Sequence, residues 1–217
     1  MVQELLKGFE EFRTQEYEGD SPSMPRLVKE GQNPRFFIIS CIDSRSNTGT
    51  VFRAAPGTFF SHKAMGAIVR PYRQGRALAA ALQYALKNGV EHIILMGHTG
   101  CGAVHSLIEG TQDPEISKFL EVAQTGLEHA KEKCPKDCSD AELHRLAEEK
   151  IILQSLENLK AFPSVSKALE EGRVTIRPWL FDMEKGQLLE HNPETGKFIV
   201  ISNDHKKEEN KEYDKTH

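Results

Sequence analysis

The sequence has few of the features that mark several large classes of protein. Only four of its 217 residues are cysteine, too few for a scaffold of disulfides in a chain of this length. We therefore expect a reducing compartment, the cytoplasm, with the thiols kept for metal binding or chemistry. No apolar run approaches the length of a membrane span. The first turns carry acidic residues, so they are expected to be neither a secretory signal nor a transit peptide.

The chain also has no excess of positively charged residues. The chain has 28 basic and 32 acidic residues and a net charge of -4, which gives no reason to expect a nucleic acid or an anionic membrane as partner. Its length and its 38% of hydrophobic residues suit one globular domain. We place that domain at residues 1–202 and expect the charged tail, 203–217, to be disordered.

The hydrophobic pattern alternates between strands and helices. Buried strands are predicted at 35–40 and 91–96, on either side of an Ala- and Leu-rich helix at 75–88. Strands separated by helices predict an α/β fold with a mainly parallel central sheet flanked by helices. The other predicted helices span 2–16, 103–109, 113–133, 140–159 and 165–171, and the other strands span 58–60, 173–181 and 187–190.

Metal-binding side chains follow both buried strands. The first ends at Cys41, and the second runs into His98 and Cys101. Sites in open parallel sheets form outside the carboxyl ends of strands, so these three residues meet if the strands are neighbours. Two thiolates and an imidazole suit zinc. Three protein ligands leave the fourth position open, as in a catalytic rather than a structural zinc site.

Asp43 and Arg45 follow Cys41 within four residues. A spacing of two puts both side chains on one face of an extended segment. Asp43 has two possible roles: it can be the fourth zinc ligand, or an ion pair with Arg45 can hold it off the metal.

Two rival motifs fail on spacing. Position 47 is Asn where a cysteine phosphatase needs Arg, and the glycines around His98 do not form a dinucleotide-binding loop.

These two motifs, CIDSR and HTGCG, resemble those of the β-class carbonic anhydrases. The likeness extends to GFEEF, GQNP, ALQYAL and VTIRPWLFDMEKGQL. The resemblance implies one zinc per chain on Cys41, His98 and Cys101, with an Asp43–Arg45 dyad beside it. It implies reversible hydration of CO2 to bicarbonate and a proton by zinc hydroxide. It also implies a homodimer or tetramer in which the helix at about 1–18, with its apolar stripe, wraps over the partner.

The substrate pocket is expected to differ from that of the family. The backbone amide of Gly102 is a candidate donor to bicarbonate, and Phe60 and Val69 are candidates for an apolar wall. Relatives usually carry an Arg-Asn-x-x-Asn segment where this chain has residues 63–67, KAMGA, and Ser46 stands where an aliphatic residue is common. Two alternatives therefore remain open: a hydrolase of carbonyl sulfide or carbon disulfide, and a non-catalytic zinc- or bicarbonate-binding protein.

Three further features have weaker predictions. Cys134 and Cys138 have a tolerable spacing for a second metal site near His129 and His144, but their place between two helices favours ordinary surface thiols. His62 is a candidate proton shuttle, although a lone histidine is more often a surface residue. Two other residues are expected to have no catalytic role. Trp179 is placed in the core or an interface, and His105 is expected to be exposed and idle.

Overall fold

The computed structural model describes residues 2–201, and its centre is a six-stranded sheet in the order β2-β1-β3-β4-β5-β6. The first four strands in that order are parallel, and β5 and β6 are antiparallel additions at one edge. The predicted fold, a mainly parallel sheet flanked by helices, is confirmed. The strands are β1 (Phe36–Cys41), β2 (Phe59–Ala64), β3 (His92–His98), β4 (Thr175–Asp182), β5 (Gln187–Asn192) and β6 (Lys197–Val200).

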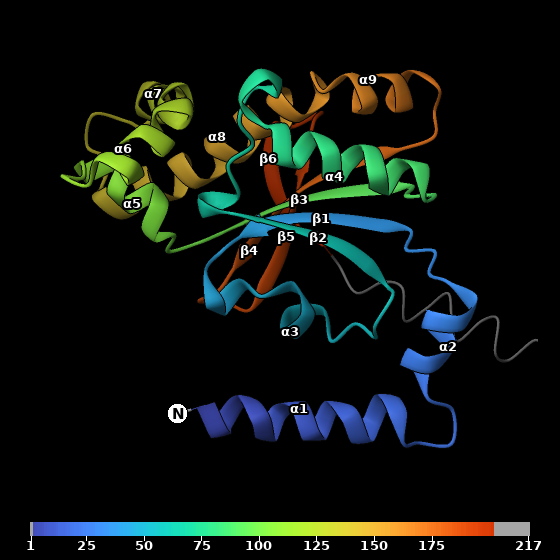
Figure 1. Cartoon of the computed structure of the whole chain (residues 1–217). Coiled ribbons are helices and arrows are strands. Elements are labelled where there is room, and N and C mark those ends of the chain that lie inside the picture. The colour runs from blue at the N-terminus through green and yellow to red at the C-terminus, as the bar shows by residue number, and fades with distance from the viewer. Residues whose placement is uncertain (1, 202–217) are drawn as a thin grey trace, which may run out of the picture.

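Helices cover the two faces of the sheet unequally. In Figure 1, α4, α8 and α9 lie on one face, α5, α6 and α7 gather beyond one end of the strands, and only the short α3 lies against the other face. No helix within residues 2–201 is long and apolar enough to cross a membrane. The helices are α1 (Val2–Tyr17), α2 (Ser23–Glu30), α3 (Thr48–Phe52), α4 (Arg76–Lys87), α5 (Gly102–Glu109), α6 (Pro114–Leu120), α7 (Gln124–Lys133), α8 (Asp140–Lys160) and α9 (Pro163–Glu170).

The two central strands are buried along almost their whole length, which explains their continuous apolar runs. Phe37 and Ile39 of β1, with Ile93 and Leu95 of β3, face α4, α8 and α9 and form the main core. Gly97 lets α8 approach β3 closely, because a Cβ there would lie 2.6 Å from the Ile152 side chain. The sheet and α8 therefore form the rigid platform on which the ends of β1 and β3 are held.

The N-terminal helix lies away from the sheet. Figure 1 shows α1 on the sparsely covered side, joined to the rest through α2. None of its residues is buried, and Leu5 is 76% and Phe9 53% exposed. The indole N–H of Trp179, on the same open side of the sheet, is buried without a hydrogen-bond partner in residues 2–201. The apolar stripe predicted for this helix thus stays largely exposed within the described chain, most of all at Leu5 and Phe9.

Several predicted boundaries differ from the structure. The strand expected at 58–60 runs on through polar Ser61 and Lys63, since an edge strand needs no continuous apolar run. The single helix expected at 113–133 is divided into α6 and α7 by a 3-10 turn at Glu121–Ala123. Three elements were not predicted, α2, α3 and β6, and all are short or largely exposed. The predicted disordered tail, 203–217, lies outside the described residues.

Candidate metal centre

The side chains of Cys41, His98 and Cys101 meet at the carboxyl edge of the sheet. Cys41 ends β1, His98 ends the neighbouring parallel strand β3, and Cys101 is the residue before α5. Their ligand atoms lie within 4.8 Å of one another, and all three residues are at most 4% exposed. The sequence-based expectation that two neighbouring strands bring these residues together is confirmed.

His98 is oriented for metal binding by the backbone of the next residue, Thr99. Its Nδ1 lies 3.0 Å from the carbonyl oxygen of Thr99, so this nitrogen is the one that donates. Its Nε2 is buried without a hydrogen-bond partner in residues 2–201 and faces the two thiols. A buried polar atom without a partner is costly. A soft or borderline cation such as zinc fits this donor set and would satisfy that nitrogen.

The Cys41 sulfur lies in a pocket of hydrogen-bond donors. It accepts from the backbone N–H of Asp43 at 3.4 Å and of Gly66 at 3.2 Å. A hydrogen bond with the Cys101 thiol, helped by His98, lowers the pKa of Cys41 to about 4 despite its burial. The same shared hydrogen bond and burial raise the pKa of Cys101. The thiol pair therefore releases its first proton from Cys41, which prepares one thiolate ligand at neutral pH.

Asp43 and Arg45 form a two-pronged ion pair. Arg45 Nε donates to Oδ1 of Asp43 at 3.0 Å, and Nη2 donates to Oδ2 at 2.8 Å. These bonds, with the backbone N–H of Arg45, hold the pKa of Asp43 well below its usual range. Oδ2 still lies 3.9 Å from His98 Nε2. Asp43 is thus paired with Arg45 and also adjoins the three candidate ligands.

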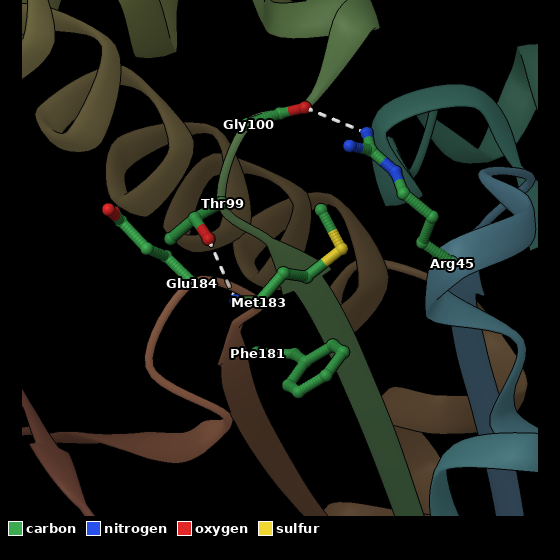
Figure 2. Close-up of a pocket in the computed structure, with 6 residues that line it drawn as sticks. All are labelled: Arg45, Thr99, Gly100, Phe181, Met183 and Glu184. Carbon is green, nitrogen blue, oxygen red and sulfur yellow. Dashed lines mark hydrogen bonds between the residues drawn. The ribbon is translucent and has the colours of Figure 1, made fainter.

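A cavity of about 480 Å³ opens beside the dyad. Figure 2 shows the Arg45 guanidinium reaching the carbonyl oxygen of Gly100, and that bond is 3.2 Å long. On the opposite wall, the hydroxyl of Thr99 accepts from the Met183 backbone N–H at 2.9 Å. Arg45 therefore lies between the strand-end loops of β1 and β3 and is the member of the dyad that lines this cavity.

Lys63 supports the site, although it was noted in the sequence only as a departure from the family. Its ammonium donates to the carbonyl oxygens of Cys41 at 3.0 Å and Ser46 at 3.3 Å. These bonds close the loop that carries Asp43 and Arg45. The sequence shows only that a lysine stands in the altered KAMGA segment. Its contact with Cys41 depends on the pairing of β1 with β2, in which Lys63 lies opposite Ser40, the residue before Cys41.

Glu148 was missed entirely. This buried residue of α8 accepts from the backbone N–H of Cys101 at 3.1 Å. Burial raises its pKa to about 7. Glu148 shares a helix face with Ile152 and Ser155. An acidic residue within an otherwise apolar stripe is the feature of the sequence that could have pointed to it.

The predicted substrate residues are spread over the fold. Phe60 packs edge-on against Tyr84 of α4, with ring centroids 5.6 Å apart. Val69 is fully buried in the main core, and its backbone N–H donates to Ser155. Neither side chain adjoins the three candidate ligands within this chain. Gly102 is the exposed first residue of α5, directly after Cys101, and its role as a donor stays a prediction.

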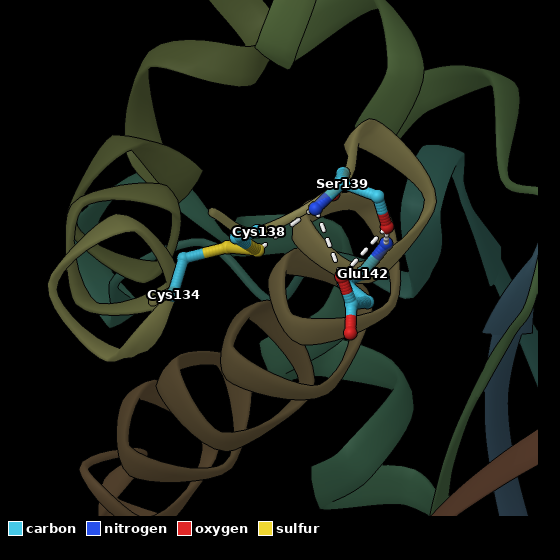
Figure 3. Close-up of a disulfide and its surroundings, with 4 residues drawn as sticks. All are labelled: Cys134, Cys138, Ser139 and Glu142. Carbon is cyan, nitrogen blue, oxygen red and sulfur yellow. Dashed lines mark hydrogen bonds between the residues drawn. A yellow bond between two sulfur atoms is a disulfide. The ribbon is translucent and has the colours of Figure 1, made fainter. Parts of the chain in front are cut away.

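The prediction of surface thiols at positions 134 and 138 is wrong. Cys134 and Cys138 form a disulfide between α7 and α8, shown in Figure 3 beside the Ser139–Glu142 capping box. Their Cα atoms are 5.6 Å apart, within the range a disulfide requires. The turn between the two helices brings these residues together, which spacing alone did not reveal. The free cysteines within residues 2–201 are Cys41 and Cys101.

The fold and site together define an α/β protein with a buried Cys-His-Cys centre at the edge of a parallel sheet. A family model described as carbonic anhydrase matches residues 36–188, which include all three candidate ligands. The chain belongs to the carbonic anhydrase family, in its β class. It is therefore an enzyme of the carbonic anhydrase type, whose general reaction is the hydration of CO2.

Relatives match over most of the chain. A carbonic anhydrase of Pseudomonas aeruginosa is 28% identical over 212 residues, covering 93% of this chain and 92% of that protein. One from Synechococcus elongatus is 27% identical over 195 residues, covering 87% and 71%. Among solved structures, the β-carbonic anhydrase CcaA has a TM-score of 0.82 at 23% identity, covering 93% and 92%. A tetrameric β-carbonic anhydrase of Sordaria macrospora has a TM-score of 0.77 at 21% identity, covering 93% and 97%.

Proposed function

We propose that this chain hydrates CO2 reversibly to bicarbonate and a proton, with one zinc held by Cys41, His98 and Cys101. The observation that carries the proposal is the buried Nε2 of His98, which faces two thiols without a hydrogen-bond partner in residues 2–201. Three buried ligands leave one coordination position for water, as catalytic zinc sites require. Zinc supplies Lewis acidity that makes hydroxide available from water near pH 7.

The chain's own residues would orient the nucleophile. Arg45 bonds both oxygens of Asp43, which keeps the carboxylate ionised and fixes the direction of its lone pairs. Asp43 can then accept a hydrogen bond from the attacking oxygen and direct that oxygen's lone pair towards the carbon of CO2. The cavity beside Arg45 gives the released proton a route to water and buffer.

CO2 is small and apolar, so its pocket needs an apolar wall near the metal. A cavity of about 300 Å³ is lined in part by Ile42, Met65 and Ile68. Ile68 packs in the same cluster as Cys41 and Cys101, and Met65 adjoins that cluster. We place CO2 against these side chains, rather than against Phe60 and Val69 of the same chain.

Hydrolysis of carbonyl sulfide or carbon disulfide is the second candidate. The observation in its favour is the segment Lys63–Ala67, which has apolar residues where the family usually has asparagines. The Lys63 ammonium is occupied by Cys41 and Ser46, so the part of the cavity wall formed by Ile42, Met65 and Ile68 stays apolar. Polar side chains, among them His62 and Arg70, line the rest of the cavity. An apolar wall suits a linear sulfur analogue of CO2 as well as CO2 itself.

We also propose that the protein works as a homodimer or a larger assembly of dimers. The exposed apolar stripe of α1 and the sparsely covered face of the sheet give two surfaces that need a partner. An N-terminal helix laid over a second copy would cover both. The Sordaria relative named above is a tetramer, which is consistent with an assembly of this kind.

The deciding experiment is stopped-flow CO2 hydration by the zinc-loaded protein at a pH of about 8.5. We expect turnover far above the buffer rate for the wild type, and a loss of most turnover with retained zinc for Asp43→Asn. Cys41→Ser should lose the metal itself. No wild-type rate above buffer would refute the proposal, and release of sulfide from carbonyl sulfide would then favour the second candidate.

A further inference from the structure

A second group of metal-binding side chains lies on the surface next to the candidate zinc centre. His105 and Glu109 are four residues apart on α5, and His144 faces them from α8. Their ligand atoms all lie within 4.8 Å of one another. The two imidazole rings have centroids 5.0 Å apart, and His105 Nδ1 lies 3.5 Å from a Glu109 oxygen. Two helices that are separate in the sequence thus present three convergent donors.

The spacing of the three side chains is compatible with a shared metal ion. Side chains at i and i+4 lie one above the other on a helix, so His105 and Glu109 can bind one ion together. Two imidazoles and a carboxylate suit borderline divalent cations, above all zinc, cobalt and nickel, and lack the soft thiolates of the buried centre. The side chains of His105 and Glu109 are 56% and 61% exposed, so water can complete the coordination shell.

We propose that His105, Glu109 and His144 form a second, surface site for a divalent transition metal that clamps α5 to α8. This site is independent of the proposed zinc at Cys41, His98 and Cys101, and neither depends on the other being occupied. The sequence led us to expect an exposed and idle His105; its exposure is confirmed, whereas the meeting with His144 could not be seen without the packing of the two helices.

The position of this site would allow a bound metal to strengthen the contact between α5 and α8. His105 of α5 lies four residues after Cys101, the residue that precedes this helix, and His144 and Glu148 are four apart along α8. The inner link between these helices is the hydrogen bond from the Cys101 N–H to Glu148. A metal on His105 and His144 would form an outer link one turn away. It would hold together the two elements that fix the position of the Cys101 ligand.

The test measures the number of zinc ions bound per chain. Untagged protein whose buried centre already holds zinc is dialysed to equilibrium against low-micromolar free zinc. We expect the wild type to take up one further zinc per chain, and His105→Gln and His144→Ala to lose that uptake. His129→Ala is the matched control, because it removes an exposed histidine from the neighbouring helix α7. The proposal is overturned if the wild type binds no further zinc, or if the site variants bind as much as the control.

The absorption spectrum of bound cobalt distinguishes the two sites. Cobalt on thiolates absorbs strongly in the near ultraviolet, whereas cobalt on imidazole and carboxylate has only weak visible bands. Adding cobalt to the zinc-loaded protein should give the weak bands alone, and Glu109→Gln, an exposed change that spares the helix packing, should diminish them. Unchanged bands in Glu109→Gln and His144→Ala would refute the site. Cys41→Ser should keep these bands even where it loses the buried metal, so the failure of one site is distinguishable from failure of the other.

Discussion

The backbone N–H of Cys101 donates a 3.1 Å hydrogen bond to Oε1 of Glu148, a residue that is 5% exposed. The bond joins the start of α5 to the middle of α8 and holds one candidate zinc ligand against the most buried helix of the fold. Burial and this contact oppose each other, since burial raises the pKa of Glu148 while the N–H donor favours its ionised form. Glu148 therefore holds the backbone of Cys101, and we expect that any side-chain oxygen at this position can accept that hydrogen bond.

Glu148→Ala should destabilise the protein by about 1–3 kcal/mol, because it leaves the buried Cys101 N–H without an acceptor. Urea unfolding at a constant pH of about 7 measures the change. Glu148→Gln is the matched control, as it keeps an oxygen and the side-chain shape. Zinc release to a chelator should be faster in the alanine variant than in the glutamine variant. Equal effects of the two substitutions would show that the hydrogen bond to Cys101 does not position the ligand.

The sequence predicted the centre of this fold well because β1 and β3 are buried on both faces. A strand of that kind is a continuous apolar run, such as Phe36 to Ile39, and it has few alternative structures. The meeting of the three candidate metal ligands could be predicted for the same reason, since neighbouring parallel strands end at one edge of the sheet. The edge strand β2 and the exposed helix α2 lack such a run, so their lengths depend on contacts that the pattern does not contain.

The supporting contacts of the site were less predictable, because they join residues far apart in the chain. Lys63 reaches Cys41 across the β1–β2 pairing, and Glu148 reaches Cys101 across 47 positions of sequence. Cys134 and Cys138 are close in sequence, but their pairing depends on the turn between α7 and α8. Local composition indicates which residues can do chemistry, whereas packing decides which of them meet.

Lys63→Met should loosen the loop that carries Asp43. Methionine keeps the apolar stem but removes the ammonium that bonds the carbonyl oxygens of Cys41 and Ser46. Loss of these charge-assisted bonds should cost about 1.5–3 kcal/mol in unfolding free energy and lower the turnover in CO2 hydration. Stopped-flow kinetics and urea unfolding measure the two effects. Lys63→Arg keeps the charge and should lose less of both; a methionine variant that matches the wild type would show that the loop is held by other contacts.

His62 should make the fold less stable in mild acid. Burial lowers the pKa of His62 below its usual 6.5. The unfolded chain therefore takes up this proton at a higher pH than the folded chain does. The contribution of His62 is complete above about pH 6.5 and is lost as the pH falls towards the folded-state pKa. Urea midpoints at several pH values between about 5 and 8 should fall less steeply in His62→Gln than in the wild type. Parallel curves for the two proteins would contradict this role.

Breaking the Cys134–Cys138 disulfide should have a small effect. The bridge closes a loop with a sequence separation of only four, so the chain-entropy model gives about 2 kcal/mol or less. The double change Cys134→Ser with Cys138→Ser should lower the urea midpoint modestly and leave the zinc content unchanged, because neither residue adjoins Cys41 or Cys101. Reductant should give the wild type the same midpoint as the variant. A loss of zinc on reduction would instead mean that the bridge supports the buried centre.

The exposed stripe of α1 gives the sharpest test of assembly. Leu5→Asp combined with Phe9→Asp puts two carboxylates on a surface that is 76% and 53% exposed at these residues in the single chain. If the stripe covers a second copy, burying these charges is unfavourable, and the protein should shift from dimer or larger assembly to monomer in sedimentation velocity. Lys7→Asp is the matched control, because it changes the net charge equally but lies on the opposite face of the helix. The control should stay assembled. A double variant that sediments like the wild type would mean that α1 does not hold the copies together, and the open face of the sheet around Trp179 would then be the surface to change next.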